Sequence, residues 1–341
     1  MNQPATGASP SPARTPLVSV IVPGKDVAAC VGDALQSLVR QFDDLRDLEV
    51  IFVDDGSEDG SLGIVEAQSA RFPNFESIRN DTSRGLSSAR NQGMMRSRGR
   101  FISFLDADDW LAPGHLASLA RDIQGMSCEF LRTDIVFVTG KERSLRRAPQ
   151  ARRGVALKPR DGILPFDRGT MVDHPFAPAG LFDRRLLDLG LLQFDDELPT
   201  AEDRPWIWGL HLKANSYAVV DSPGYLYRRG SPTSLSQLVN AQRLVYLRAL
   251  DQIRLMVEAD DDGDLFMPKV MRTVLALTAH HVDSYDLMEP DVQRMFVDGV
   301  RALLASFPPD VVLDAMEKSP PERVQRLAFI FGETNAEEVR R

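Results

Sequence analysis

The chain has few cysteines, few histidines and no long apolar run. Its two cysteines, Cys30 and Cys128, lie far apart without CxxC spacing, so neither a disulfide framework nor a zinc site is expected. Both are predicted to be small core residues in a reducing compartment.

No segment approaches the roughly 18 uninterrupted apolar residues that a membrane-spanning helix needs. We therefore expect a soluble protein, with the cytoplasm as its default location.

The sequence also lacks an excess of positive charge, with 40 Lys and Arg residues against 49 Asp and Glu residues and a net charge of -9. Nucleic acids are bound by basic surfaces whose counterion release drives affinity, so no nucleic acid partner is expected.

Residues 1–16 have neither the basic start nor the apolar stretch of a signal peptide. Because they are rich in Pro, Ser, Ala and Thr, they are predicted to form a disordered arm.

What the sequence does contain is an alternation of short apolar runs and helical patterns. Apolar runs predict strands at residues 17–22, 49–53, 75–79 and 101–105, and helical spacing predicts helices at residues 27–39, 61–71 and 86–98. This alternation predicts a wound α/β sheet of parallel strands with helices on both faces. Such sheets bind ligands at the carboxyl ends of their strands.

The second half of the chain is predicted to change from mixed to purely helical structure. Further strands are expected at residues 128–138, 176–182, 217–220 and 225–228, helices at residues 184–189 and 201–213, and a basic loop at residues 141–160. From residue 235 onward only helical spacing is present. The predicted organisation is a disordered arm at 1–16, an α/β domain at 17–234 and a helical C-terminal domain at 235–341.

Acidic residues follow two of the predicted strands. Asp106, Asp108 and Asp109 come directly after the strand at residues 101–105. Their carboxylates are suitable ligands for Mn²⁺ or Mg²⁺, which can bridge two phosphates and neutralise a departing diphosphate. Alternatively, these residues cap the helix that begins near Pro113. Taken alone, the motif fits both explanations equally well.

Two further segments favour a ligand site. Asp54 and Asp55 end the strand at residues 49–53, where the alternative is a plain Asx turn into the next helix. Near the helix start at residue 86, Arg84 and Arg90 suit a phosphate or a nucleotide edge, and the alternative is an ordinary Ser-capped helix. Acidic residues at two neighbouring strand ends are less easily explained by turns alone.

These segments resemble the successive signature segments of family-2 glycosyltransferases, in the family's order: residues 18–23 (VSVIVP), 53–57 (VDDGS), 85–91 (GLSSARN) and 104–109 (FLDADD). The resemblance is to bacterial members that build cell-surface polysaccharides and teichoic acids. It implies a GT-A fold, a nucleotide-diphospho-sugar donor, a divalent metal and inversion at the anomeric carbon. Rival enzymes on a similar sheet fit less well, because residues 23–26 (PGKD) lack both the G-x-G-x-x-G and the P-loop motif.

Matched position by position, the resemblance implies a nucleotide pocket. Pro23 would line this pocket, Asp54 and Asp55 would contact the base and the ribose, and Arg84 would contact the nucleotide. The sequence departs from the family at residues 25–26, where Lys-Asp replaces the usual Tyr-Asn. The donor is expected to be a UDP-sugar.

The resemblance also implies how the diphosphate is held. Asp106 would face the ribose or a metal-bound water, and Asp108 would be the direct ligand of Mn²⁺ or Mg²⁺. Arg228, Arg229 and Ser231 would reach the diphosphate as a lid that keeps water from the donor. The alternative for these last three residues is a solvated loop between domains.

Residues 200–203 (TAED) resemble the Glu-Asp segment in which the family places its general base. Inversion needs a carboxylate on the acceptor side that takes the proton of the attacking hydroxyl. Asp203 is predicted to be this base, with Glu202 beside it. Without the resemblance, a capping box at the start of a helix would be the better explanation of these residue types.

The predicted function is metal-dependent, inverting transfer of a sugar to a hydroxyl of a cell-surface glycan or a polyol-phosphate acceptor. The alternative is a catalytically degenerate scaffold or binding subunit that acts through its C-terminal helices, which are also the predicted surface for a homo-oligomer. The basic stretch at residues 141–160 would dock on the inner face of the membrane or on a phosphate-bearing acceptor. More often such a stretch is simply solvated.

Overall fold

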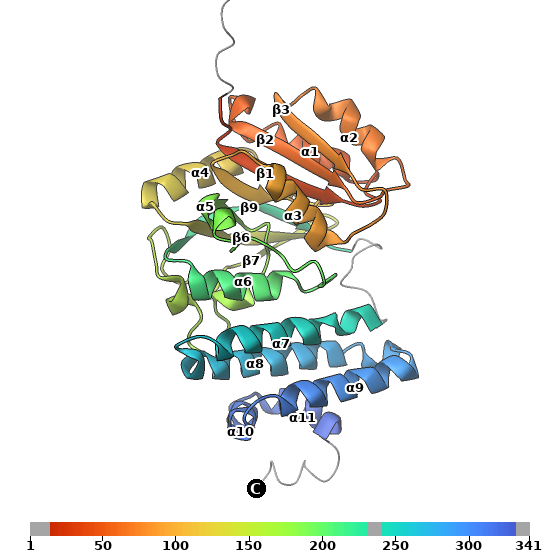
Figure 1. Ribbon diagram of the computed structural model, residues 1–341, viewed down its shortest axis with the longest axis vertical. Coiled ribbons are helices and arrows are strands. Elements are labelled where there is room, and N and C mark those ends of the chain that lie inside the picture. Colours follow the sequence, from red (N-terminus) through yellow and green to blue (C-terminus); the bar gives the residue numbers. More distant parts are fainter. Residues whose placement is uncertain (1–13, 231–240, 332–341) are drawn as a thin grey trace, which may run out of the picture.

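The computed structural model describes residues 14–230 and 241–331, which form a sheet flanked by helices and then a stack of helices (Figure 1). The first part contains strands β1 (Val18–Gly24), β2 (Leu48–Asp54), β3 (Asn74–Arg79), β4 (Phe101–Phe104), β5 (Trp110–Leu111), β6 (Phe130–Thr139), β7 (Glu142–Arg146), β8 (Gly180–Asp183) and β9 (Tyr217–Arg228). Its helices are α1 (Val31–Leu38), α2 (Ser61–Ser69), α3 (Leu86–Arg96), α4 (His115–Met126), α5 (Arg185–Asp188) and α6 (Asp203–Lys213).

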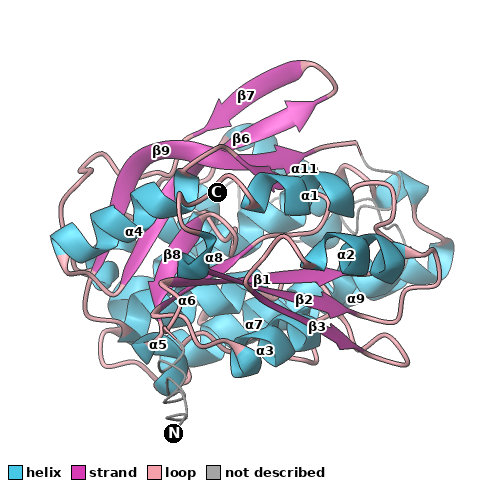
Figure 2. Ribbon diagram, turned by 90° about the horizontal axis from the view of Figure 1, so that it is seen from above, coloured by secondary structure: helices cyan, strands magenta, loops and turns pink. Residues whose placement is uncertain are grey.

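The first four long strands form the predicted parallel sheet, in the order β3-β2-β1-β4. Successive side chains of a strand point to opposite faces, and β1 is buried along its whole length. Val20 and Val22 pack in the core that α1 and α4 cover, whereas Ile21 packs in the core that α3 and α6 cover. Figure 2 shows α1 and α2 on one side of these strands and α3 on the other.

The other half of the sheet, for which the sequence predicted strands but no strand direction, is mixed. The full order is β3-β2-β1-β4-β8-β6-β9-β5, and β8 runs antiparallel to both β4 and β6. The two strands expected near residues 217–220 and 225–228 form one strand, β9, which passes Pro223 with a register shift in its pairing with β6. Apolar runs indicate where a strand lies, but its direction depends on how the chain returns to the sheet.

The stretch at residues 141–160 was predicted to be a loop, and this prediction is wrong for its first part. Gly140, with a φ of 58°, turns the chain so that β7 pairs antiparallel with the end of β6. All five residues of β7 are exposed, so no alternation of apolar and polar residues marks this strand in the sequence. The hairpin of β6 and β7 projects from the sheet (Figure 2).

The predicted helical C-terminal region is confirmed by helices α7 (Val245–Glu258), α8 (Gly263–Val282), α9 (Pro290–Ala305), α10 (Pro309–Glu317) and α11 (Pro321–Phe331). The predicted boundary at residue 234 lies outside the described residues. Fully buried Lys269 of α8 holds this region against the first part of the chain, because its ammonium group donates to the Arg168 carbonyl at 2.7 Å and pairs with Asp173. Arg160 adds an ion pair to Asp260 at 2.6 Å.

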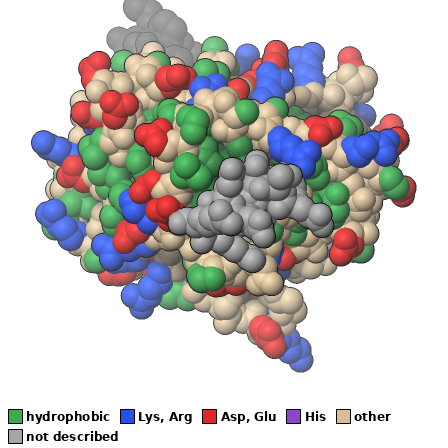
Figure 3. All heavy atoms as spheres, turned by 90° about the horizontal axis from the view of Figure 1, so that it is seen from below, with side chains coloured by type: hydrophobic (Ala, Val, Ile, Leu, Met, Phe, Trp, Pro, Cys, Tyr) green, Lys and Arg blue, Asp and Glu red, His purple; other side chains and the backbone are tan. Residues whose placement is uncertain are grey.

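Two surface predictions concern the helical region and the membrane. Seen from below, the described surface has charged side chains around apolar patches (Figure 3), and the exposed large apolar residues of this region include Met295, Leu313 and Phe329. Oligomerisation through these helices stays a prediction. None of the helices within residues 14–230 and 241–331 has the length and apolar character needed to cross a membrane.

Gly93 provides a test of how closely α3 packs on β1. A β-carbon at Gly93 would lie 2.4 Å from Cγ2 of Ile21, which is closer than any normal contact. Gly93→Ala is therefore expected to lower the free energy of unfolding by about 1–3 kcal/mol, measured by chemical denaturation. The matched control is Gly209→Ala in α6, where a β-carbon meets nothing within 4 Å and a gain of up to about 1 kcal/mol is expected. The same change in both variants would contradict the close packing.

Candidate active site

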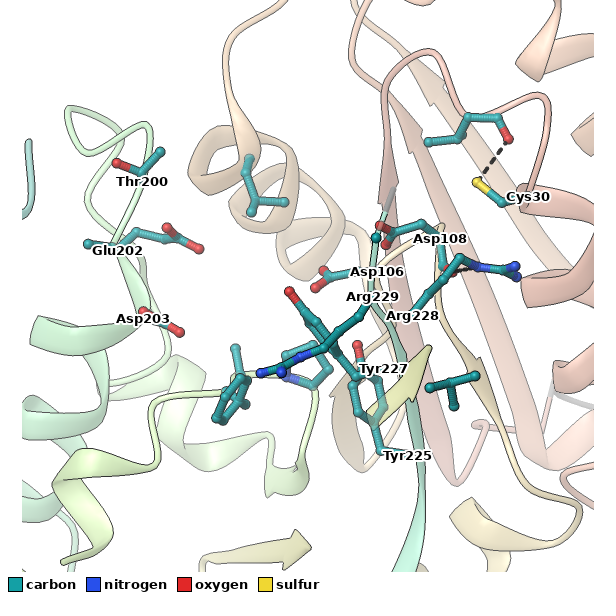
Figure 4. Close-up of a pocket in the computed structure, with 18 of the residues that line it drawn as sticks. Cys30, Asp106, Asp108, Thr200, Glu202, Asp203, Tyr225, Tyr227, Arg228 and Arg229 are labelled. Carbon is teal, nitrogen blue, oxygen red and sulfur yellow. Dashed lines mark hydrogen bonds between the residues drawn. The ribbon is translucent and has the colours of Figure 1, made fainter. Parts of the chain in front are cut away.

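The candidate site is a cavity of about 930 Å³ between the carboxyl ends of the central strands, the start of α6 and the helical region. Seven of the residues singled out from the sequence line it: Arg90, Asp106, Asp108, Glu202, Asp203, Arg228 and Arg229. Figure 4 shows Glu202 and Asp203 on one side and Asp106 and Asp108 on the other. The tertiary structure therefore brings together two acidic segments that lie almost a hundred positions apart in the sequence.

Arg90 of α3 links these two segments. Its guanidinium donates through Nη1 to Glu202 at 2.7 Å and through Nη2 to Asp106 at 2.8 Å. The Arg90 side chain is only 3% exposed, and its guanidinium also lies over the Phe194 ring. Burial alone would lower the pKa of Arg90, but the two carboxylates raise it above its usual value. Sequence reasoning assigned Arg90 to a phosphate or nucleotide edge, whereas the structure gives it two internal carboxylate partners.

Asp106 and Asp108 differ in their surroundings. Asp106 accepts from the Arg90 guanidinium, whereas the Asp108 carboxylate has only its own backbone N–H and the nearby Arg228 charge, among the described residues, to favour its charged form. Burial and the Asp106 charge raise the pKa of Asp108 from 3.8 to about 6. Two neighbouring carboxylates whose charges Arg90 and Arg228 compensate only in part form an environment that favours a cation. The described residues contain no cluster of three or more His, Cys, Asp or Glu side chains that could hold a metal ion.

Asp109 has a structural role next to this pair. Its carboxylate accepts from the Tyr225 hydroxyl and, at 2.6 Å, from the Arg228 backbone N–H. The Arg228 side chain donates to the Asp108 carbonyl at 2.8 Å and to the Asp33 carboxylate at 3.0 Å. The end of β9 is therefore clamped onto the acidic segment. Tyr225, which sequence reasoning did not single out, is fully buried and could have been suspected only from its place in a strand.

Asp203 occupies the first turn of α6. Helix α6 has Glu202 at its N-cap position and no side-chain capping hydrogen bond, so the capping box that was the alternative explanation is not formed. Ala201, just before, has a φ of 59°, a left-handed conformation that costs a non-glycine residue of the order of 1 kcal/mol. Burial and the Glu202 charge raise the pKa of Asp203 well above its usual value. The local backbone thus holds a basic carboxylate in the cavity.

Four of the residues predicted to contact the nucleotide, Pro23, Asp54, Asp55 and Arg84, lie outside the set that lines the cavity. Asp55 accepts from the backbone N–H groups of Arg84 and Gly85, at 2.8 and 2.9 Å, and also from Ser83 and Asn80. It therefore shapes the loop that leads into α3. Fully buried Asp54 accepts from the Ser57 N–H at 3.2 Å.

Pro23 lies inside the buried strand β1, and the Arg84 side chain is exposed. Nucleotide contacts of Pro23, Asp54, Asp55 and Arg84 stay predictions. Ser231 lies outside the described residues.

Cys30, predicted to be a core residue, is only half-buried and lines the cavity, whereas Cys128 is buried as predicted.

Comparisons with known proteins identify relatives of this chain. The model of the family "Glycosyl transferase family 2" matches residues 19–186. The chain is 28% identical to the uncharacterised glycosyltransferase EpsJ of Bacillus subtilis, over 65% of this chain and 64% of EpsJ. It is 30% identical to the succinoglycan biosynthesis protein ExoO of Rhizobium meliloti, over 76% of this chain and 70% of ExoO. The match thus spans less than two thirds of the length of EpsJ.

A solved structure shows the same fold. The crystal structure of Staphylococcus aureus TarS 1–349 in complex with UDP-GlcNAc matches with a TM-score of 0.69 and 19% identity, over 94% of this chain and 91% of that one. Full-length TarS, a poly(ribitol-phosphate) beta-N-acetylglucosaminyltransferase, is 27% identical over 61% of this chain and 35% of TarS. The predicted GT-A fold with a helical C-terminal region is confirmed.

Arg90 is expected to be essential for stability. Arg90→Met removes one partner of two buried ion pairs and leaves Glu202 and Asp106 uncompensated, so the free energy of unfolding should fall by about 3–5 kcal/mol in chemical denaturation. The matched control is Arg96→Met in the same helix, because Arg96 is 62% exposed and pairs with Glu76 on the surface. A loss of at most about 1 kcal/mol is expected there. Similar losses in the two variants would contradict the bridging role.

The raised pKa of Asp108 predicts how stability depends on pH. Between its unfolded pKa near 3.8 and its folded pKa of about 6, the folded state binds more protons than the unfolded state, so stability falls as the pH rises through this window. Asp108→Asn should therefore stabilise the metal-free protein at pH 7, by roughly 1–2 kcal/mol, and have little effect at pH 4. Thermal unfolding in EDTA measures this difference. Asp81→Asn, at an exposed aspartate, is the control, and an equal effect of both variants would contradict the assignment.

Proposed function

The chain belongs to glycosyltransferase family 2, and we propose that it transfers a sugar from a UDP-sugar to a hydroxyl of a cell-surface glycan or polyol-phosphate polymer. The observation that carries this proposal is that Asp203 faces the pair Asp106 and Asp108 across one cavity. A donor diphosphate at the acidic pair would leave its sugar between the two sides. UDP-GlcNAc bound to TarS and the polymer acceptor in the name of TarS support the same substrate classes.

The donor end of the cavity would hold Mn²⁺ or Mg²⁺. Asp108 would be the direct ligand and Asp106 a second ligand or the partner of a bound water. These two carboxylates suit such an ion, because Mg²⁺ is commonly bound by one or two carboxylates together with substrate phosphates and water. When bound, the ion would act as a Lewis acid that neutralises the charge of the leaving diphosphate. The raised pKa of Asp108 is consistent with a carboxylate that lacks a cation partner.

The acceptor end would supply the general base. As the acceptor oxygen attacks the anomeric carbon, the Asp203 carboxylate would take the hydroxyl proton, and the bond to the diphosphate would break on the opposite side of the sugar. A single displacement of this kind inverts the configuration. The raised pKa of Asp203 makes it a stronger base than an ordinary aspartate. Arg90 would act through Glu202 and Asp106, whose positions it determines.

The scaffold alternative requires a protein that does not turn over donors. Nothing in the geometry favours it, because the acidic residues of both ends face one continuous cavity. A cytoplasmic location and docking on the membrane through residues 141–160 stay predictions. A panel of nucleotide-sugars tested for metal-dependent hydrolysis separates the two functions, since a scaffold would be inert toward every donor.

Asp203→Asn tests the base directly. The variant should bind UDP with Mn²⁺ as the wild type does, because the donor end is unchanged, and this is measured as the thermal shift that the ligands cause. Sugar transfer, measured as UDP released in the presence of acceptor, should fall roughly 100- to 10,000-fold. Glu197→Gln is the matched control, because Glu197 is an exposed carboxylate on the segment before α6.

Full transfer activity in Asp203→Asn would show that another group takes the proton. The same assays applied to Asp108→Asn test the metal ligand. Unchanged metal dependence in that variant would show that Asp108 does not hold the ion.

A further inference from the structure

Three arginines gather at the acceptor end of the cavity. Arg204 follows Asp203 directly and Arg229 follows the last residue of β9, and both line the cavity. Arg146 of β7 lies near both of them. Burial lowers the pKa of its guanidinium, and the charges of Arg204 and Arg229 lower it further. Within residues 14–230 and 241–331, none of these three guanidinium groups has a carboxylate at ion-pair distance or a side-chain hydrogen bond. We call them the arginine cluster.

An aromatic platform holds the arginine cluster in place. Phe137, Phe176 and Tyr227 contact one another, with ring centroids 5.6–6.2 Å apart. The Arg229 guanidinium lies 3.7 Å from the centre of the Phe137 ring, and that of Arg146 lies 5.4 Å from the centre of the Phe176 ring. Such stacking orients a guanidinium and leaves the N–H groups at its edge free to bind an anion.

The arginine cluster is separate from the donor end. Successive residues of an extended chain point to opposite sides, and Figure 4 shows the side chains of Arg228 and Arg229 directed apart. Arg228 reaches the Asp108 carbonyl and Asp33, whereas Arg229 points toward the side on which Asp203 lies. The charge of Arg204 acts on Asp203 and lowers its pKa, against the larger effect of burial. A hydroxyl held at Asp203 would therefore place the neighbouring groups of its own chain beside the cluster.

We propose that the arginine cluster binds anionic groups of the acceptor, and that the acceptor is a polyanionic chain carrying phosphodiester or carboxylate groups next to the reacting hydroxyl. This inference rests on the proposed function and names the substrate class of its acceptor. Guanidinium groups bind such oxyanions with two parallel hydrogen bonds. Because the three arginines come from β7, the first turn of α6 and the residue after β9, they suit a chain with several successive charges.

The net charge of the chain argues that the attraction is local. With a net charge of -9, the molecule as a whole repels polyanions, and only a site with uncompensated arginines can bind one. Nucleic acid is also a polyanion, but it would need an extended basic surface for affinity. Arg204 and Arg229 instead line the cavity beside the proposed base. These facts favour an acceptor whose charges and hydroxyls alternate closely.

Binding of defined oligomers tests the proposal. Fluorescently labelled ribitol-phosphate oligomers, oligogalacturonate, neutral dextran oligomers and a single-stranded oligodeoxynucleotide are titrated into the full-length protein and followed by anisotropy. Either the ribitol-phosphate oligomers or oligogalacturonate should bind at least roughly tenfold more tightly than dextran and the oligodeoxynucleotide. The tighter of these two probes shows whether the acceptor carries phosphodiester or carboxylate groups. The double variant Arg204→Gln with Arg229→Gln should lose this difference. The matched control is Arg121→Gln, at an exposed arginine of α4, which should keep it.

Three outcomes would overturn the inference: equal affinity for dextran and the anionic oligomers, unchanged binding in the double variant, or tightest binding of the oligodeoxynucleotide. The thermal shift with UDP and Mn²⁺ separates this inference from the proposed function. It should be the same in wild type and double variant, and its loss in the double variant would assign the arginines to the donor. If the double variant does not fold, Arg229→Gln alone should weaken anionic probes, and Arg229→Lys should restore part of the affinity because it keeps the charge.

Discussion

The buried bridge that Arg90 makes between Asp106 and Glu202 is the interaction on which the site depends. Two carboxylate-bearing segments that face one cavity repel each other, and a single buried guanidinium compensates part of that repulsion. The bridge also leaves a functional asymmetry. Glu202 and Asp106 have a cation partner, whereas Asp108 and Asp203, the two residues with proposed chemical roles, keep raised pKa values.

The end of β9 organises the cavity around this bridge. Asp109 accepts from the Tyr225 hydroxyl and from the Arg228 backbone N–H, so the directions of Arg228 and of the next residue, Arg229, are fixed. Arg228 stays near the acidic pair and over the Trp110 ring, whereas Arg229 lies on the aromatic platform toward the acceptor end. Donor and acceptor functions can thus be separated by the opposite directions of two adjacent side chains where β9 ends.

The helical region completes the wall of the cavity as well as packing against α6. Tyr246 and His281 stack with ring centroids 3.8 Å apart, and both line the cavity. The Arg243 guanidinium donates to Nδ1 of His281, and burial together with this charge lowers the pKa of His281 to about 3. This histidine is therefore a neutral part of the wall. The position of the wall depends on the buried Lys269 and Asp173 pair between the two regions.

The sequence by itself determined the parallel strands β1 to β4, the acidic residues at their ends and the helical C-terminal region, because apolar periodicity and strand-end motifs are local properties. It could not reveal β7, whose side chains are all exposed, or the antiparallel direction of β8. Only the tertiary structure decided that Arg90 bridges two carboxylates and that Arg146, Arg204 and Arg229 meet at one end of the cavity. Such partnerships join residues far apart in the chain, and they follow from how the elements pack.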